Sequence, residues 1–278
     1  MVVNIYLLLG LEHAEALSWN PRCMLLKNLI VSHLLLTLTI GPPALYCLLY
    51  RVTLSFSFRC IAQYFTVSVS LINSLLTVTS MALERFVYTC HGIHYLGIMT
   101  NIRMYSFMIL LWLLALTGAG MSTVLVLMGG ANFGRIIAGF VCEPEVVQAQ
   151  LEQSKYFETF NKIFVGAVLF LCLLVFLFSH GRMYQEARKM QQPFQQDNAR
   201  ARCTIFFYFV IFLLQLFPST IKLITMCGRD VDNQIYMIIL VLVPPCINPL
   251  AYAMRNKEVS QALGRLCGWR KLKELFCQ

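Results

Sequence analysis

Six long apolar runs occupy most of this chain, at about 24–50, 60–86, 104–128, 156–181, 202–227 and 235–254. Each has about the 20 residues that a helix needs to cross roughly 30 Å of hydrocarbon. The runs are continuously apolar and do not alternate in ten-residue segments, so they favour helices over the strands of a barrel. Hydrophobic residues make up 58% of the chain and charged residues 13%, which is too apolar for one water-soluble core. The sequence therefore predicts an all-α integral membrane protein, with residues 1–278 as a single domain.

A seventh apolar run at the very start is short. The stretch VVNIYLLLG gives about 13 Å of helix at 1.5 Å per residue. It lacks the basic segment and the small-residue cleavage site of a signal peptide. The simplest interpretation is a partial first helix at 1–10, the inner half of a span whose outer half is missing. The expected architecture is a seven-transmembrane helix bundle with a truncated N-terminus, followed by a tail at 255–278.

The loop charges predict how the chain is oriented. Fourteen Lys and Arg residues lie in one set of loops and in the tail, and five lie in the opposite set. Basic loops favour the cytoplasmic side. The tail, the polar hinge 182–202 and Arg85 are therefore expected in the cytoplasm, with the N-terminus and the loop 129–155 outside. The predicted location is the plasma membrane, with several passes.

Two pairs of cysteines bear on the orientation of the chain. Cys60 and Cys142 are both expected on the outer side, where a disulfide can persist; the alternative is two unpaired thiols. Cys267 and Cys277 lie in the basic tail. They are either palmitoylated, anchoring a short amphipathic C-terminal helix at the lipid surface, or ordinary free thiols.

The formal net charge of +9 does not indicate a nucleic-acid partner, since the basic residues follow the loops and no nucleic-acid-binding motif is present. The sequence contains neither a Gly-rich phosphate loop nor an HExxH stretch. No enzymatic activity, cofactor or metal is expected. Membrane lipids are the partner that composition predicts.

Several short motifs resemble one receptor family. MALERFVYTC closes the second full run and is similar to the Asp-Arg-Tyr region of rhodopsin-class receptors, and more closely to the MAxDRYVAIC stretch of odorant receptors. CINPLAYAMRNKE, at the end of the last run, resembles the family's Asn-Pro-x-x-Tyr motif. Trp112, the spacing from Cys60 to Arg85 and the spacing from Asn4 to His33 also match the family. The stretch NPRCMLLKNLIVSH most resembles the odorant receptors of fish.

The resemblance covers the whole chain and implies a class A G-protein-coupled receptor of the olfactory type. Such a receptor binds a small odorant ligand from outside and activates a heterotrimeric G protein inside. The resemblance also implies a disulfide between Cys60 and Cys142. Three alternatives remain: a non-olfactory orphan receptor of the same fold, a non-functional truncated product, and a small transporter or channel, for which inverted repeats are not found.

The resemblance assigns six residues to an activation switch: Glu84, Arg85, Pro218, Asn248, Pro249 and Tyr252. Arg85 is always charged and is expected to pair with Glu84 at rest and to leave it on activation. Pro249 frees a backbone carbonyl and permits a bend, and Pro218 offers a hinge. Read alone, Glu84 and Arg85 could simply mark the membrane interface.

Three positions depart from the family pattern. Phe86 replaces a Tyr, and Leu216 replaces the Trp that many members carry near Pro218. His33 replaces an Asp that commonly coordinates sodium, and a neutral imidazole is a poor ligand for a hard cation. No sodium regulation is therefore expected. His33 is either an interior histidine hydrogen-bonded to Ser74 or Asn248, or a group that titrates near neutral pH.

The expected ligand pocket is apolar with a few hydroxyls, suited to a small and mostly apolar molecule. Its residues, counted from Cys60 and Pro218 by the resemblance, are Val67, Ser68, Leu71, Ile72, Ser219, Thr220, Lys222 and Leu223. Lys222 either faces the bundle, where it would favour an anionic ligand, or reaches outward to the interface.

Overall fold

A computed structural model describes the chain in several stretches. They are residues 2–13, 20–50, 55–130, 133–134, 142, 144–189, 206–207, 209–217, 220–221, 245, 247–248 and 251.

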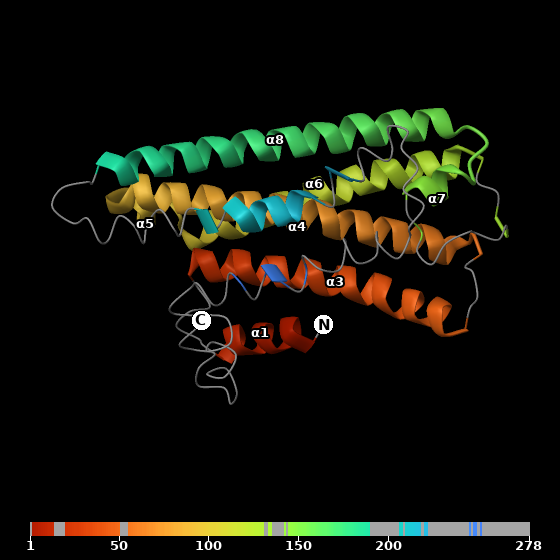
Figure 1. Ribbon diagram of the computed structural model, residues 1–278, viewed down its shortest axis with the longest axis horizontal. Helices are drawn as coiled ribbons and strands as arrows, with labels where there is room; N and C mark the ends of the chain where they lie inside the picture. Colours follow the sequence, from red (N-terminus) through yellow and green to blue (C-terminus); the bar gives the residue numbers. More distant parts are fainter. Residues whose placement is uncertain are drawn as a thin grey trace.

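Four long helices dominate this part of the chain (Figure 1). They are α3 (Pro21–Tyr50), α4 (Phe58–Cys90), α6 (Asn101–Met128) and α8 (Ser154–Lys189). All four are long and apolar enough to cross a membrane. Shorter elements accompany them: α1 (Val2–His13), η1 (Gly92–His94), α5 (Tyr95–Ile98) and α7 (Pro144–Gln148). The fold class is therefore the all-α membrane bundle that the apolar runs predict.

The helices follow the first four predicted spans and extend past most of their ends. The predicted partial helix at 1–10 corresponds to α1, which has 12 residues. The predicted spans at 202–227 and 235–254 are described only in short helical pieces, among them 209–217 and 247–248. The tail at 255–278, with its predicted amphipathic helix, lies outside the described residues, as do Cys267 and Cys277.

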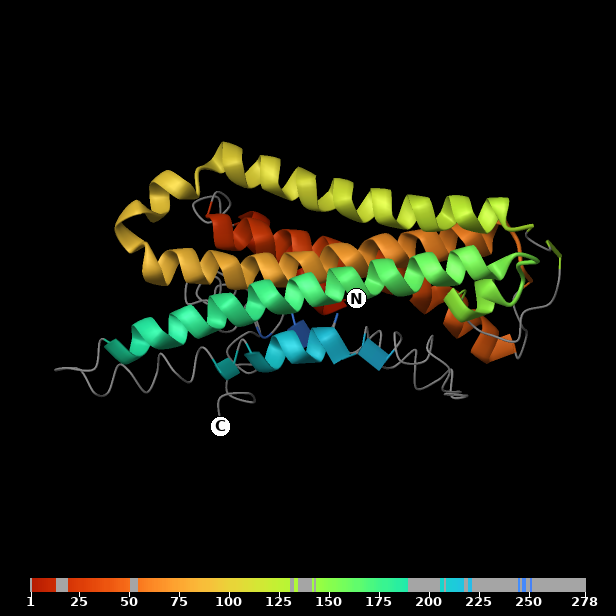
Figure 2. The same ribbon diagram turned by 90° about the horizontal axis from the view of Figure 1, so that it is seen from above.

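Helix α4 occupies the centre of the bundle. It lies between α3 and α8 in Figure 1 and between α6 and α8 in Figure 2, and it packs against all three. Its interior face carries small polar side chains as well as apolar ones, with Ser70, Asn73, Ser74 and Thr77 completely buried. Helices α6 and α8 instead expose large apolar side chains such as Leu113 and Phe178. Lipid covers such surfaces at no cost, whereas a buried hydroxyl or amide needs a protein partner.

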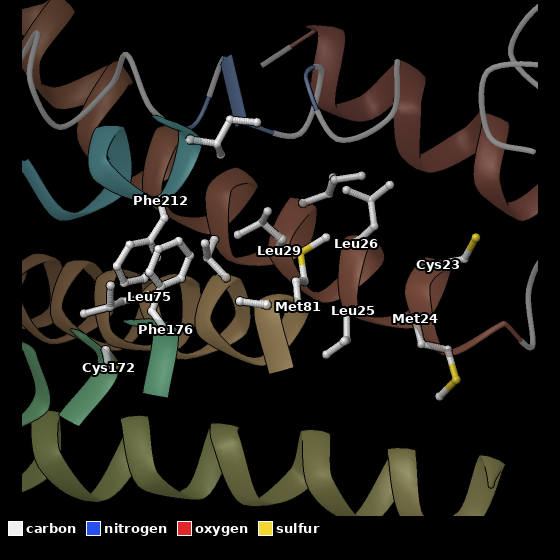
Figure 3. Packing of buried hydrophobic residues seen from close by; sticks show 14 of the residues in the cluster. Cys23, Met24, Leu25, Leu26, Leu29, Leu75, Met81, Cys172, Phe176 and Phe212 are labelled. Carbon is white, nitrogen blue, oxygen red and sulfur yellow. The ribbon is translucent and has the colours of Figure 1, made fainter. Parts of the chain in front are cut away.

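The largest apolar cluster joins α1, α3, α4 and α8 to the segment 209–217 (Figure 3). Within it, the rings of Phe176 of α8 and Phe212 stack with centroids 3.5 Å apart. The cluster places residues 209–217 next to α8 and α4, although the 118 residues 91–208 separate them from the end of α4.

Helices α6 and α8 make a close contact at Gly118. A Cβ atom at this position would overlap the ring of Phe164, whereas a Cβ at Gly120, two residues further on, would meet no atom within 4 Å. Small residues of this kind let membrane helices approach closely.

We expect Gly118→Val to weaken the bundle and Gly120→Val to leave it nearly unchanged. Both changes put the same β-branched residue into one helix, so they share the change in helix propensity. Only the first forces Phe164 to move, at about 1–3 kcal/mol. The apparent melting temperature of the purified protein in one detergent measures the difference; equal shifts for both variants would contradict the contact.

Candidate functional site

Polar side chains tie α4 to α3 and α6 in the middle of the bundle. Trp112 Nε1 donates a hydrogen bond of 2.8 Å to Asn28 Oδ1, and Asn28 Nδ2 donates one of 2.8 Å to Thr77 Oγ1. A second bond, 2.7 Å from Asn73 Nδ2 to Ser32 Oγ, joins the same two faces of α3 and α4. These bonds fix three helices in register, because sliding any one of them would leave an amide without a partner. Asn28 and Thr77 were not predicted, although polar residues in an apolar run are a signal to look for.

A second network contains Asn248, one of the predicted switch residues. Asn248 Nδ2 donates to Gln215 Oε1 at 2.5 Å, and Gln215 Nε2 donates to Ser74 Oγ at 2.9 Å. All three side chains are buried. Gln215 therefore links α4 to the Asn-Pro-x-x-Tyr segment. Sequence reasoning missed it, although a Gln inside the apolar run IFFYFVIFLLQLF was visible.

The predicted hydrogen bonds of His33 are wrong. Ser74 and Asn248 both bond to Gln215, whose longer amide reaches between them. His33 is completely buried, and neither ring nitrogen has a hydrogen-bond partner in the described part of the chain. That His33 titrates near neutral pH stays a prediction. Pro218, Pro249 and Tyr252 lie outside the described residues.

The disulfide expected from the family resemblance is present. Cys60, in the first turn of α4, is bonded to Cys142. The Gln63 side chain lies one turn along α4 and makes two further bonds. Its Nε2 donates to the carbonyl oxygen of Thr39 at 3.2 Å, and its Oε1 accepts from the backbone N–H of Cys142 at 3.4 Å.

The Thr39 carbonyl needs this donor. Helix α3 continues through Pro42 and Pro43, and a proline cannot donate to the carbonyl four residues before it. Pro43 therefore leaves the oxygen of Thr39 without its helical partner, and Gln63 supplies one. One side chain thus compensates the proline and holds the disulfide loop.

Tyr64, beside Gln63, anchors a third polar group at the same end of α4. Its hydroxyl lies 2.5 Å from Ser122 Oγ of α6, and Ser122 Oγ donates to Asn161 Oδ1 of α8 at 2.9 Å. Three helices therefore meet at buried, paired hydroxyl and amide groups. None of these residues was predicted.

The predicted pocket residues of α4 do not form one wall. Val67 and Leu71 pack against Leu36 and Ile40 of α3, while Ile72 packs on the opposite side, against α6. Ser68 is partly buried. Thr220 donates its hydroxyl hydrogen to the carbonyl of Phe217 at 2.8 Å. Ser219, Lys222 and Leu223 lie outside the described residues.

At the opposite end of α4 a buried carboxylate gathers several donors. Glu84 is only 2% exposed. Arg22 Nε of α3 lies 3.0 Å from Glu84 Oε1, and the Tyr95 hydroxyl donates to the same oxygen at 2.7 Å. Arg85 Nε lies 3.7 Å from Glu84 Oε2. The predicted contact between Glu84 and Arg85 therefore exists, but it is longer than the contact with Arg22.

Two aromatic residues support this carboxylate. The guanidinium carbon of Arg22 lies 3.9 Å from the ring centre of Tyr88, a cation–π contact. The rings of Tyr88 and Tyr95 meet edge to face with centroids 5.3 Å apart. Burial, and next the negative charge of Glu84, raise the pKa of the Tyr95 phenol, which therefore stays protonated and can donate. In the sequence Arg22 was interpreted as one of many loop charges. No sequence pattern indicated that Tyr95 would contact Glu84.

Phe86, where the family has Tyr, packs between two aromatic rings. Its ring meets His91 at 5.7 Å and Phe178 of α8 at 5.6 Å, both edge to face. The lost hydroxyl is thus replaced by an aromatic contact with α8.

Four apolar helices long enough to cross a membrane, joined by buried polar contacts, are typical of a multi-pass membrane protein. The sequence matches the family described as 7 transmembrane receptor (rhodopsin family) over residues 3–252. The chain belongs to this family.

Among known proteins it is similar to olfactory receptors. Human olfactory receptor 14I1 is 25% identical over 251 residues, which cover 89% of this chain and 80% of the relative. Human olfactory receptor 2AG1 is 27% identical over 278 residues, or 96% of this chain and 85% of the relative. Rat olfactory receptor 1468 is 24% identical over 285 residues, or 99% and 88%.

The double role of Gln63 gives a prediction. Gln63→Leu should destabilise the protein by about 1–3 kcal/mol, because it leaves the partly buried Thr39 carbonyl and the backbone N–H of Cys142 without this partner. In a Pro43→Ala background residue 43 regains its N–H and can bond to Thr39 itself, so the same change should cost clearly less. Apparent melting temperatures of the four proteins test this; additive shifts would contradict the link between Gln63 and Pro43.

Proposed function

We propose that this chain, an odorant-type G-protein-coupled receptor, binds a small, mostly apolar ligand near the disulfide end of α4 and activates a heterotrimeric G protein at the Arg85 end. In this proposal the disulfide end faces the outside of the plasma membrane and the C-terminal tail faces the cytoplasm. The distribution of Lys and Arg over the loops supports this orientation. The resemblance of residues 20–33 to fish odorant receptors stays a prediction. We assign no enzymatic step, since members of this family act as receptors.

The observation that carries the proposal is the buried Glu84 in contact with Arg85. A carboxylate that is 2% exposed costs several kcal/mol unless it is paired. Arg85 has five donors and keeps its charge at every accessible pH. It can therefore exchange one acceptor for another without losing its ionisation. We infer that Arg85 contacts Glu84 at rest and turns toward the G protein on activation.

The hydrogen-bonded chain Ser74–Gln215–Asn248 supports a second part of the mechanism. It joins the middle of α4 to Asn248, the first residue of the Asn-Pro-x-x-Tyr motif. A displacement at Asn248 therefore pulls on α4 about three turns from Arg85. We propose that this chain couples the Asn-Pro-x-x-Tyr segment to the switch.

We place the ligand beside Ser68, with Val67, Leu71, Ile72, Ser219, Thr220, Lys222 and Leu223 as further candidates. The side chains of Tyr64, Ser122 and Asn161 are hydrogen-bonded to one another. We therefore treat them as the rigid support of this region. Ser68, one turn along α4 from Tyr64, is partly buried, and its hydroxyl contacts the Tyr64 hydroxyl. It would contribute a single hydrogen bond to an otherwise apolar ligand.

The switch is tested with Arg85→Ala. We expect ligand-stimulated cAMP to fall by about tenfold or more, because charge-assisted bonds contribute about 1.5–3 kcal/mol each, while the amount of receptor at the cell surface is largely kept. Arg103→Ala is the matched control, since Arg103 is exposed and bonds only to the carbonyl of Gly97 among the described residues. Unchanged signalling by Arg85→Ala would refute the switch.

The pocket is tested with Ser68→Ala against a panel of odorants. The change should shift the half-maximal concentration of hydroxyl- or carbonyl-bearing odorants by about three- to tenfold, the effect of one neutral hydrogen bond. Responses to pure hydrocarbons should stay the same. Thr66→Ala is the control, because the Thr66 hydroxyl is spent on the carbonyl of Ala62. Equal effects of both changes across the panel would contradict the pocket.

A further inference from the structure

Glu84 contacts three donor side chains, although the proposed switch uses only Arg85. Its Oε1 atom accepts from Arg22 at 3.0 Å and from Tyr95 at 2.7 Å, while Arg85 approaches only Oε2, at 3.7 Å. Arg22 belongs to α3, so the stronger ion pair runs between two helices. The weaker pair joins neighbours in one helix. Glu84 would therefore stay paired if Arg85 moved away.

Arg22 is well fixed for such a role. It lies in the first turn of α3, where its backbone N–H donates to Asn20 Oδ1 at 3.2 Å. Its guanidinium packs on the Tyr88 ring. Its Nη2 atom is buried and has no hydrogen-bond partner among the described residues. Arg22 thus brings a spare donor to the carboxylate that it already contacts.

We propose that Arg22 is a positioning residue of the switch, which keeps Glu84 compensated when Arg85 leaves. This inference rests on the proposed role of Arg85. When Arg85 turns away, Glu84 Oε2 loses its cation. In this proposal Arg22 Nη2, which is buried and without a hydrogen-bond partner among the described residues, then binds that oxygen, and the single contact becomes a paired one.

The physical argument is one of cost. If an arginine leaves a buried carboxylate that has no other partner, the carboxylate stays buried and uncompensated, and its full desolvation cost opposes the move. A second guanidinium removes most of this cost, since two parallel N–H donors match a carboxylate and form the strongest kind of ion pair in proteins. Arg22 therefore favours the released state of Arg85, and the Tyr95 hydroxyl helps by holding Oε1 in both states.

This arrangement predicts that loss of Arg22 lowers the signal per surface receptor, whereas a purely structural role of Arg22 predicts no change in that signal. Without Arg22, Glu84 depends on Arg85, so Arg85 is held more tightly at rest. Arg22→Met, which keeps the length of the side chain but removes its charge, should lower ligand-independent cAMP per surface receptor by about tenfold or more, the effect of one charge-assisted hydrogen bond. Arg22→Lys should keep at least part of the signal.

The experiment uses the full chain, with an epitope tag to count surface receptors and with Arg22→Met, Glu84→Gln and the double variant compared side by side. Glu84→Gln removes the charge that Arg22 compensates. It should raise ligand-independent cAMP, and adding Arg22→Met should then change nothing. If Arg22→Met does not reach the surface, Arg22→Gln replaces it, since it also lacks the charge.

Two results would overturn the inference: Arg22→Met with unchanged or higher cAMP per surface receptor, or the same loss in the presence and absence of Glu84→Gln. The failure of the underlying switch looks different. In that case Arg85→Ala keeps wild-type signalling and Glu84→Gln does not raise it. A loss of surface receptor with a constant signal per receptor would show Arg22 to be a structural tie only.

Discussion

The bundle depends on one constraint, which is that hydrocarbon offers no hydrogen bonds. Polar groups inside the spans must therefore find partners in the protein. Helix α4 carries many of them, and it meets each neighbour through a specific pair: Asn73 with Ser32 of α3, Tyr64 with Ser122 of α6, and Ser74 with Gln215. Apolar contacts alone would let the helices slide or rotate, because lipid tails replace one apolar neighbour as well as another. The polar pairs select one arrangement.

The sequence was informative where a property is carried by one segment. Length and hydropathy predicted the four spanning helices, and motif spacing pointed to the disulfide and to Glu84 beside Arg85. It was uninformative where the property depends on how two helices face each other. Arg22 looked like any other loop charge, since nothing in the neighbouring sequence says that α3 begins beside Glu84. For the same reason His33 was paired with Ser74 and Asn248, whereas the longer side chain of Gln215 occupies both.

The two ends of α4 are stabilised in different ways. At the disulfide end the contacts are covalent or between neutral groups, and each donor has a definite acceptor: Gln63 with Thr39, and Ser122 with Asn161. Breaking one of them leaves a buried group unpaired, so this end resists rearrangement. At the other end, cations on two helices share the carboxylate of Glu84, and a guanidinium can change acceptors while it stays fully charged.

In the proposed mechanism this difference decides which end of α4 can move. A structure that changes shape in a membrane must exchange polar contacts without passing through an uncompensated buried charge. Arg22, Arg85 and Tyr95 around one carboxylate satisfy this condition, because any one donor can leave while the others remain. The neutral ties near Cys60 do not. A ligand bound near the disulfide would therefore act on one end of α4, while the donors around Glu84 at the other end of the same helix can exchange partners.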